Sequence, residues 1–129
     1  MTSHALYIQL DDSFPATLSE KILVTLLRLK LGFKGIVISD DLEMGALSKF
    51  ADFKEVVHLA WRAQNDFLLV CHDLENVQLL YEALGKSSHG QPFKSYHAQS
   101  SERIQKLHSY LQKQSLLPNS NSVKEYFKI

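Results

Sequence analysis

Two adjacent carboxylates, Asp40 and Asp41, are the residues of this sequence best suited to catalysis. They follow directly on residues 35–39, a run of glycine, isoleucine, valine and serine without polar alternation. Such a run is typical of a parallel strand that is covered on both faces. Because α/β folds carry catalytic groups at the carboxyl ends of their parallel strands, a nucleophile or a general acid or base could stand here.

The alternation of side chains along a strand limits what these two carboxylates can do together. Asp40 shares a face with Ile38, whereas Asp41 starts on the opposite face with Ser39. A retaining glycosidase needs two catalytic carboxyl groups about 5 Å apart across the substrate, so a second group would have to come from elsewhere. From the residues alone, the favoured interpretation is that Asp41 caps the next helix while Asp40 is a solvated loop acid.

The second apolar run, residues 67–71, ends in Cys71 and His72, which face opposite ways along an extended chain. No further cysteine or histidine cluster stands at ligand spacing, so neither a metal site nor a cofactor is predicted. Cys71 is interpreted as a small buried hydrophobic residue.

The elements that would position Asp40 alternate between strand and helix. A short apolar strand is expected over residues 4–9, followed by a helix with capping-box spacing at Thr17 and Glu20 and a C-terminal cap at Gly32. Further helices are predicted over the ranges 53–63, 74–84 and 100–112. This alternation indicates an α/β fold with three parallel strands, in which residues 4–9 lie on the other side of the 35–39 strand from residues 67–71.

Composition limits the partners and the compartment. The 129 residues include 45% hydrophobic side chains and 14 basic against 14 acidic residues, a net charge of zero that favours neither a nucleic acid nor an anionic membrane as partner. The start lacks the features of a signal peptide, and no apolar run could span a bilayer. The single cysteine suits a reducing compartment, so a cytoplasmic location is expected. Uncovered strand edges predict a chain that is either self-associated or partly disordered, and the zero net charge does not oppose association.

Three segments together resemble a known family. They are Pro-Ala-Thr-Leu-Ser at residues 15–19, Leu-Leu-Arg at 26–28 and Leu-Gly-Phe-Lys-Gly-Ile-Val-Ile-Ser-Asp-Asp-Leu-Glu-Met at 31–44. In order, spacing and type they are similar to the bacterial β-N-acetylglucosaminidases of glycoside hydrolase family 3. The resemblance extends to Met-Thr-Ser-His at residues 1–4 and Asp-Phe-Leu-Leu-Val-Cys-His-Asp at 66–73.

The resemblance implies a site and a reaction. The first aspartate of the family's Ser-Asp-Asp motif is a covalent nucleophile, which carries over to Asp40, and family members have a histidine at the place of His4. His4 is therefore a candidate substrate-binding residue, the alternative being a histidine satisfied by protein partners. The implied reaction removes terminal β-linked N-acetylglucosamine, as in muropeptide recycling, through a glycosyl-aspartate.

The resemblance also implies a partial (β/α)8 barrel, with residues 1–113 as its C-terminal part and residues 114–129 as a tail of unassigned structure. The family's Lys-His and Asp-Ser-His motifs, which bind sugar and supply the acid/base, are absent from this sequence, and Met1 corresponds to a position inside a barrel strand. Gln64 stands where the family usually has glycine, which predicts an altered turn. Two hypotheses result: a hydrolase segment that is active in a complete barrel, and a non-catalytic remnant or assembly module.

Overall fold

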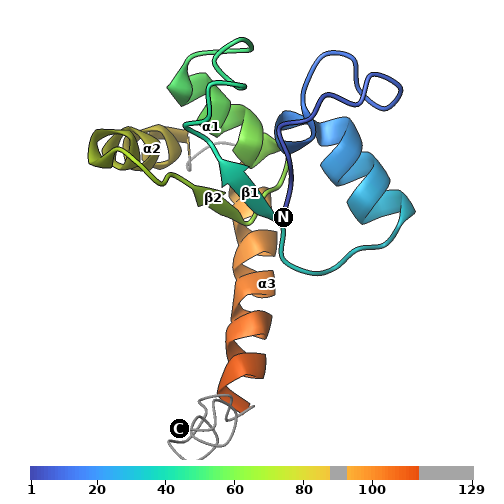
Figure 1. Cartoon of the computed structure of the whole chain (residues 1–129). Helices are drawn as coiled ribbons and strands as arrows, with labels where there is room; N and C mark the ends of the chain where they lie inside the picture. The colour runs from blue at the N-terminus through green and yellow to red at the C-terminus, as the bar shows by residue number, and fades with distance from the viewer. Residues whose placement is uncertain (88–92, 114–129) are drawn as a thin grey trace, which may run out of the picture.

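The structure is a computed structural model that describes residues 1–87 and 93–113. At its centre lies a parallel sheet of two strands, β1 (Ile38–Asp41) and β2 (Phe67–Leu69) (Figure 1). The predicted parallel pairing of the two apolar runs is thus confirmed, although both strands are shorter than the runs. The chain has an α/β fold.

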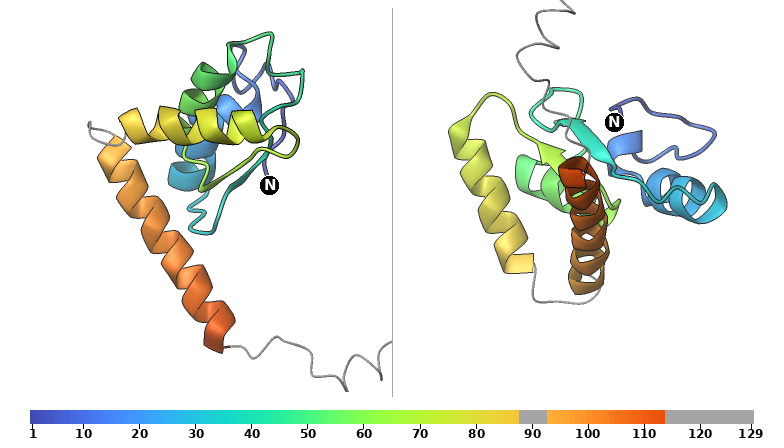
Figure 2. Two further views of the ribbon diagram at one scale, coloured as in Figure 1. Left: turned by 90° about the vertical axis from the view of Figure 1, so that its left-hand side faces the viewer. Right: turned by 90° about the horizontal axis from the view of Figure 1, so that it is seen from below.

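Helices surround this sheet and account for most of the described residues. They are η1 (Ala16–Leu18), η2 (Lys21–Lys30), α1 (Phe53–Arg62), α2 (Leu74–Ser87) and α3 (Phe93–Lys113). The last of these begins seven residues before the predicted start at residue 100 and points away from the rest of the molecule (Figure 2). None of the described helices combines the length and the apolar character needed to cross a membrane.

The core lies where α1 packs against the sheet and its connecting segments. Asp52 caps α1, because its side chain accepts a hydrogen bond from the Glu55 amide at 3.0 Å. The helix then buries Val56, Val57 and Ala60. These side chains pack in one cluster with Leu18, Leu42, Leu47 and Ala83. The covering of the sheet by the helix at 53–62 therefore agrees with the prediction.

The predicted strand over residues 4–9 is wrong. Only the first residues lie along β1, where the Thr2 amide donates to the Ile38 carbonyl at 2.8 Å. The carbonyls of Ser3 and Ala5 instead accept from the amides at the start of η1, and residues 7–11 form a turn closed on the Tyr7 carbonyl. Within residues 1–9 the Thr2 amide makes the one backbone hydrogen bond to β1, and the chain turns away at residues 7–11, so the described sheet has two strands rather than three.

The helix predicted after Thr17 exists, but its start differs from the prediction. Ser19, not Thr17, caps it, since the Ile22 amide donates to the Ser19 hydroxyl at 3.0 Å. Segment η2 is a π-helix, and the Leu31 amide donates to the Leu26 carbonyl in the same wide pattern. The cap at Gly32 is confirmed, with a φ of 67° that suits glycine.

The turn between α1 and β2 keeps the conformation that a glycine would adopt. Gln64 has a φ of 61°, in the left-handed region. Its carbonyl accepts from Arg28 Nη2 at 2.9 Å, and the following Asn65 donates through Nδ2 to the carbonyls of Thr17 and Ala60. The predicted alteration of this turn is therefore wrong, because these contacts hold the glutamine in a conformation that is uncommon for a residue with a side chain.

A buried ion-pair network joins the amino ends of both strands to two helices. The Asp66 carboxylate contacts Arg28 Nη2 at 3.0 Å and Arg103 Nη2 at 2.8 Å, and it accepts from the Val37 amide at 2.8 Å. The exposed fraction of the Asp66 side chain is 0%. Burial and the nearby charge of Arg103 lower the pKa of Arg28, while Asp66 opposes that shift.

Removal of the Asp66 carboxylate should leave two buried guanidinium groups without a counter-ion. We expect Asp66→Ala to lower the free energy of unfolding by about 3–5 kcal/mol, measured by urea denaturation. Glu20→Ala is the matched control, because Glu20 pairs with Arg62 at the surface with side-chain exposures of 42% and 49%. Its loss should be about 1 kcal/mol or less. Equal losses in the two variants would contradict the importance assigned to the buried network.

Candidate functional site

Asp40 lies at the carboxyl end of β1, on the opposite side of the strand from its two neighbours. Ser39 and Asp41 are buried whereas Ile38 and Asp40 are half-buried, as strand alternation predicts. Within the described ranges, the one hydrogen bond to the Asp40 carboxylate comes from the Asp41 amide, which donates to Oδ1 at 2.9 Å. The other oxygen is left for an external partner.

A bulge in β1 determines how this strand end meets β2. Ile38 pairs with Phe67 and Asp41 with Leu69, so three steps along β1 match two along β2. At the bulge the Leu69 amide donates to the Ser39 hydroxyl at 2.9 Å. Ser39, to which the sequence assigned no role, thus adds a side-chain hydrogen bond to the strand pairing beside Asp40.

The Asp41 carboxylate is fully engaged within the protein. Its Oδ1 accepts from the Glu43 amide at 3.1 Å, and its Oδ2 lies 3.0 Å from His72 Nδ1. Asp41 therefore does not cap the following helix, a role that Asp52 fills. Of the two adjacent acids, only Asp40 keeps a carboxylate oxygen without a protein contact in the part of the chain that the structure describes.

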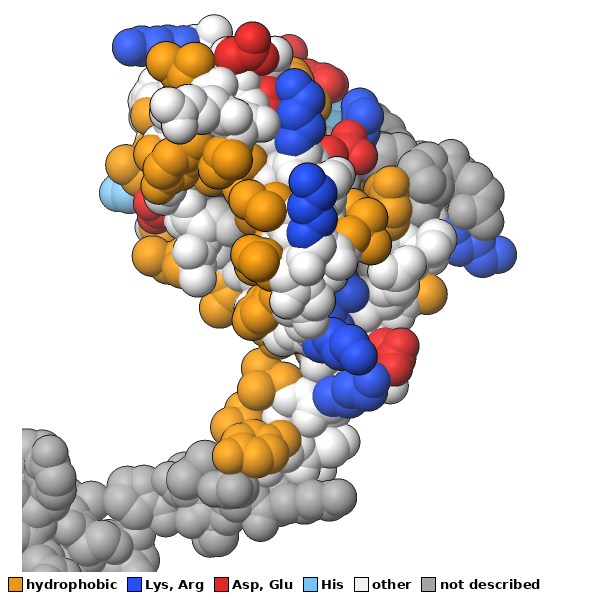
Figure 3. Space-filling model, turned by 90° about the vertical axis from the view of Figure 1, so that its right-hand side faces the viewer, with side chains coloured by type: hydrophobic (Ala, Val, Ile, Leu, Met, Phe, Trp, Pro, Cys, Tyr) orange, Lys and Arg blue, Asp and Glu red, His pale blue; other side chains and the backbone are white. Residues whose placement is uncertain are grey.

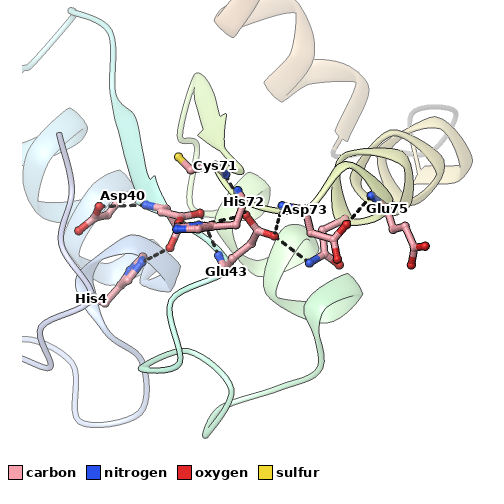
Figure 4. A network of polar contacts seen from close by, with 9 residues as sticks. His4, Asp40, Glu43, Cys71, His72, Asp73 and Glu75 are labelled. Atoms are coloured by element: carbon pink, nitrogen blue, oxygen red, sulfur yellow. Dashed lines mark hydrogen bonds and ion pairs between the residues drawn. The ribbon is translucent and has the colours of Figure 1, made fainter.

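His4 lies beside Asp40 (Figure 4), and both of its ring nitrogens are bonded to protein groups. Nδ1 is 3.0 Å from the Thr17 hydroxyl, and Nε2 is 2.8 Å from the Asp41 carbonyl. Because a carbonyl only accepts, Nε2 must carry a hydrogen. The geometry matches the alternative interpretation, in which the ring nitrogens of His4 are hydrogen-bonded to protein groups. A role of His4 in binding sugar stays a prediction.

Glu43 connects the loop after β1 to the segment after β2. Its carboxylate accepts from the backbone amides of Cys71, His72 and Asp73 at 2.8, 2.6 and 3.0 Å, and from Asn76 Nδ2 at 2.9 Å. The bond from Asn76, together with those from the three amides, lowers the pKa of Glu43 against the opposing effect of desolvation.

Asp41, Glu43 and His72 form a group whose ligand-type atoms lie within 4.8 Å of one another. Sequence spacing did not reveal this group, because residues 41–43 and residue 72 meet only through the pairing of β1 with β2. Carboxylates and an imidazole in this arrangement could hold a divalent cation. The carboxylate oxygens of Asp41 and Glu43 already accept hydrogen bonds, and His72 Nδ1 already contacts Asp41. These contacts explain why the three side chains lie together without an ion.

Cys71 is exposed, so its interpretation as a buried hydrophobic residue is wrong. The strand β2 ends at Leu69, two residues earlier than the apolar run, and the chain then turns outward to bring its amides to Glu43. Loss of solvation, and next the negative charges of Asp41, Glu43 and Asp40, raise the pKa of the Cys71 thiol.

The thiol of Cys71 can report on the carboxylates beside it. Because its pKa is raised, less thiolate is present at pH 8 and alkylation by iodoacetamide should be slower than for an ordinary exposed cysteine. Asp41→Asn removes a negative charge and should move the midpoint of the pH–rate profile to lower pH. The exposed Asp12, changed to asparagine, is the control and should leave the midpoint in place. Identical midpoints in both variants would contradict the proximity of these charges.

Sequence and structure comparisons place the chain among glycoside hydrolases. The profile of the glycosyl hydrolase family 3 N-terminal domain matches residues 1–107. An uncharacterized secreted glycosyl hydrolase of Arthroderma benhamiae is 35% identical over 113 residues, covering 86% of this chain and 32% of that protein. A β-hexosaminidase of Neisseria meningitidis is 38% identical over 82 residues, covering 64% of this chain and 22% of that protein.

The fold is also similar to that of solved enzymes. The β-N-acetylglucosaminidase from Thermotoga maritima superposes with a TM-score of 0.70 and 38% identity over 82% of this chain and 24% of that one. The chain thus spans between a fifth and a third of the length of these relatives. Since the family profile covers most of its residues, the chain belongs to glycosyl hydrolase family 3 and matches the N-terminal domain of that family.

Proposed function

We propose that Asp40 is the nucleophile of a retaining β-N-acetylhexosaminidase, and that the substrate is a glycoside or muropeptide with a terminal β-linked N-acetylglucosamine. The similarity to proteins named β-hexosaminidase and β-N-acetylglucosaminidase supports this substrate class. The observation that carries the proposal is the contrast between three neighbouring carboxylates. Asp41 and Glu43 are bonded at both oxygens, whereas Asp40 keeps one oxygen for a substrate.

The proposed reaction has two displacements at the anomeric carbon. In the first, an Asp40 carboxylate oxygen forms a bond to that carbon as the bond to the leaving oxygen breaks, and the leaving oxygen takes up a proton from an acid. In the second, water attacks the same carbon, gives up a proton and releases Asp40 as a carboxylate. Two inversions give net retention. Neither His4 nor His72 contacts the Asp40 carboxylate in the structure, so neither is assigned as the acid.

We propose further that residues 1–113 act as part of a (β/α)8 barrel. The parallel strands β1 and β2, with α1 between them in sequence, form the β–α–β unit from which such barrels are built. Asp40 then stands at the carboxyl ends of the strands, the face that carries active sites in this fold. Residues 114–129, expected to be a tail, lie outside the described residues.

The nucleophile assignment can be tested in a chimaera. Residues 1–113 would replace the corresponding segment of the Thermotoga maritima enzyme, and turnover of p-nitrophenyl N-acetyl-β-D-glucosaminide would be measured. Asp40→Ala should lower kcat by several orders of magnitude, because the covalent intermediate itself is lost. The exposed Asp12→Ala is the control and should keep turnover. Near-normal turnover in the Asp40→Ala protein would refute the assignment.

The second candidate function is an assembly module that hydrolyses nothing alone. It is favoured by the apolar side chains on the side formed by the N-terminal segments, where Figure 3 shows hydrophobic groups gathered at the surface. The most exposed of them in residues 6–10 and 29–33 are Ile8 at 72%, Leu29 at 73% and Leu31 at 69%. The zero net charge does not oppose contact between two copies.

This second candidate predicts self-association of the 129-residue chain. Light scattering at increasing protein concentration should show a mass above that of a monomer, and Ile8→Ser with Leu29→Ser should lower it because the apolar area is reduced. Leu74→Ser on α2 is the control, since that side chain is 85% exposed but lies on another element. A monomer that turns over the aryl glycoside in an Asp40-dependent way would exclude the assembly module.

A further inference from the structure

We propose that Glu43 is a positioning residue for Asp40: its carboxylate fills an anion-binding nest formed by the segment after β2, and this contact holds the carboxyl end of β1 in place. The inference rests on the proposed function of Asp40, because it concerns the geometry of that carboxylate. Glu43 would not touch the substrate.

The nest consists of backbone and side-chain donors that converge on one point. Three consecutive amides, those of residues 71–73, and Asn76 Nδ2 donate to the two oxygens of Glu43 at 2.6 to 3.0 Å. Successive amides that point the same way form an anion-binding concavity. It lies at the start of the 14-residue helix α2, whose dipole adds to the attraction for a negative charge. Figure 4 shows Glu43 reaching across from the loop after β1.

The carboxylate of Glu43 is suited to stay in the nest as an anion. Its side chain is 9% exposed, and each oxygen accepts two of the four hydrogen bonds. Hydrogen bonds to an ionised acceptor are shorter and stronger than those between neutral groups. The donors therefore hold one charged group rather than water.

Capping of α2 does not explain the contact. Asp73 supplies that function, since its Oδ1 accepts from the Glu75 amide at 2.8 Å. The Glu43 bonds instead span 28 to 33 residues of sequence and join the segment that follows β1 to the segment that follows β2. Their role is to fix two strand ends relative to each other.

A second connection between the same segments leads to Asp40. The nest fixes the backbone of His72, whose Nδ1 lies 3.0 Å from Asp41 Oδ2, and the Glu43 amide donates to Asp41 Oδ1. With both oxygens held, the Asp41 residue is fixed, and its amide is the group that donates to Asp40 Oδ1. Loss of the Glu43 carboxylate should therefore alter the position of the Asp40 carboxylate.

Chemical rescue of Glu43→Ala in the full 129-residue chain tests this inference without an activity assay. Amide hydrogen exchange at residues 71–73 should accelerate by about tenfold or more, as expected when each amide loses a hydrogen bond to a charged acceptor. The ¹³Cγ resonance of Asp40 should shift. Sodium formate, which can fill the vacated nest, should restore both signals, whereas sodium chloride at equal ionic strength should not.

Glu75→Ala is the matched control. This variant removes an equal charge from the first turn of α2, beside the nest, where Glu75 bonds to the described residues through its backbone amide. Glu43→Gln serves as a second variant with nearly the original volume, in case alanine prevents folding, and should also accelerate exchange at residues 71–73. Unchanged exchange in both Glu43 variants, or effects equal to those of Glu75→Ala, would overturn the inference.

The test separates failure of the inference from failure of the proposed function. In the chimaera, Glu43→Ala should lower kcat more than it raises KM, with partial recovery in formate. If Asp40→Ala retains turnover there, the proposed function fails while the exchange data still decide whether Glu43 fills the nest. If Asp40→Ala abolishes turnover but Glu43→Ala behaves as Glu75→Ala does, the positioning role is wrong and the nucleophile assignment stands.

Discussion

The buried carboxylate of Asp66 is the constraint on which the arrangement of the other segments depends. It lies directly before β2, accepts from the amide before β1, and pairs with arginines of η2 and α3. A buried charge is tolerated only if its partners are held in good geometry, so the network admits few alternative packings. The central sheet has only two strands, and side-chain contacts of this kind replace the neighbours that a wider sheet would supply.

The two ends of the sheet are held by different carboxylates. Asp66 acts at the amino ends, where its charge is compensated by two arginines, and Glu43 acts at the carboxyl ends, where backbone amides compensate its charge. Asp40 lies between these anchors at the end of β1. The proposed role of Asp40 as a nucleophile requires a fixed position, and the structure gives its carboxylate one hydrogen bond on a strand that is held at both ends.

The local pattern of residue types was sufficient to predict those strands and helix ends that depend on neighbouring residues in the sequence. The runs at 35–39 and 67–71 indicated parallel strands because they are apolar without polar alternation, and Gly32 indicated the end of a helix because a left-handed turn restricts residue type. The cover expected on both faces of these strands is only partial, since Phe67 of β2 is exposed and Leu68 and Leu69 are half-buried. The prediction of a strand at 4–9 was wrong, because apolar residues alone do not reveal that the chain turns on the Tyr7 carbonyl at residues 7–11. The motif predicted a role for Asp40, which stays a prediction, whereas the contacts of Glu43 and His72 join residues about 30 positions apart and leave no signature in spacing.

The hydroxyl of Ser39 has a consequence for the specificity of folding. With its bulge, β1 pairs with β2 in a register that buries Asp41 and leaves Asp40 half-buried, and in this register the Ser39 hydroxyl accepts from the Leu69 amide. A slip by one residue would move every side chain of β1 to the opposite face, so the two aspartates would exchange places and the Ser39 hydroxyl would point away from Leu69. The bond between Ser39 and Leu69 therefore favours the register that leaves Asp40 half-buried over the registers one residue away.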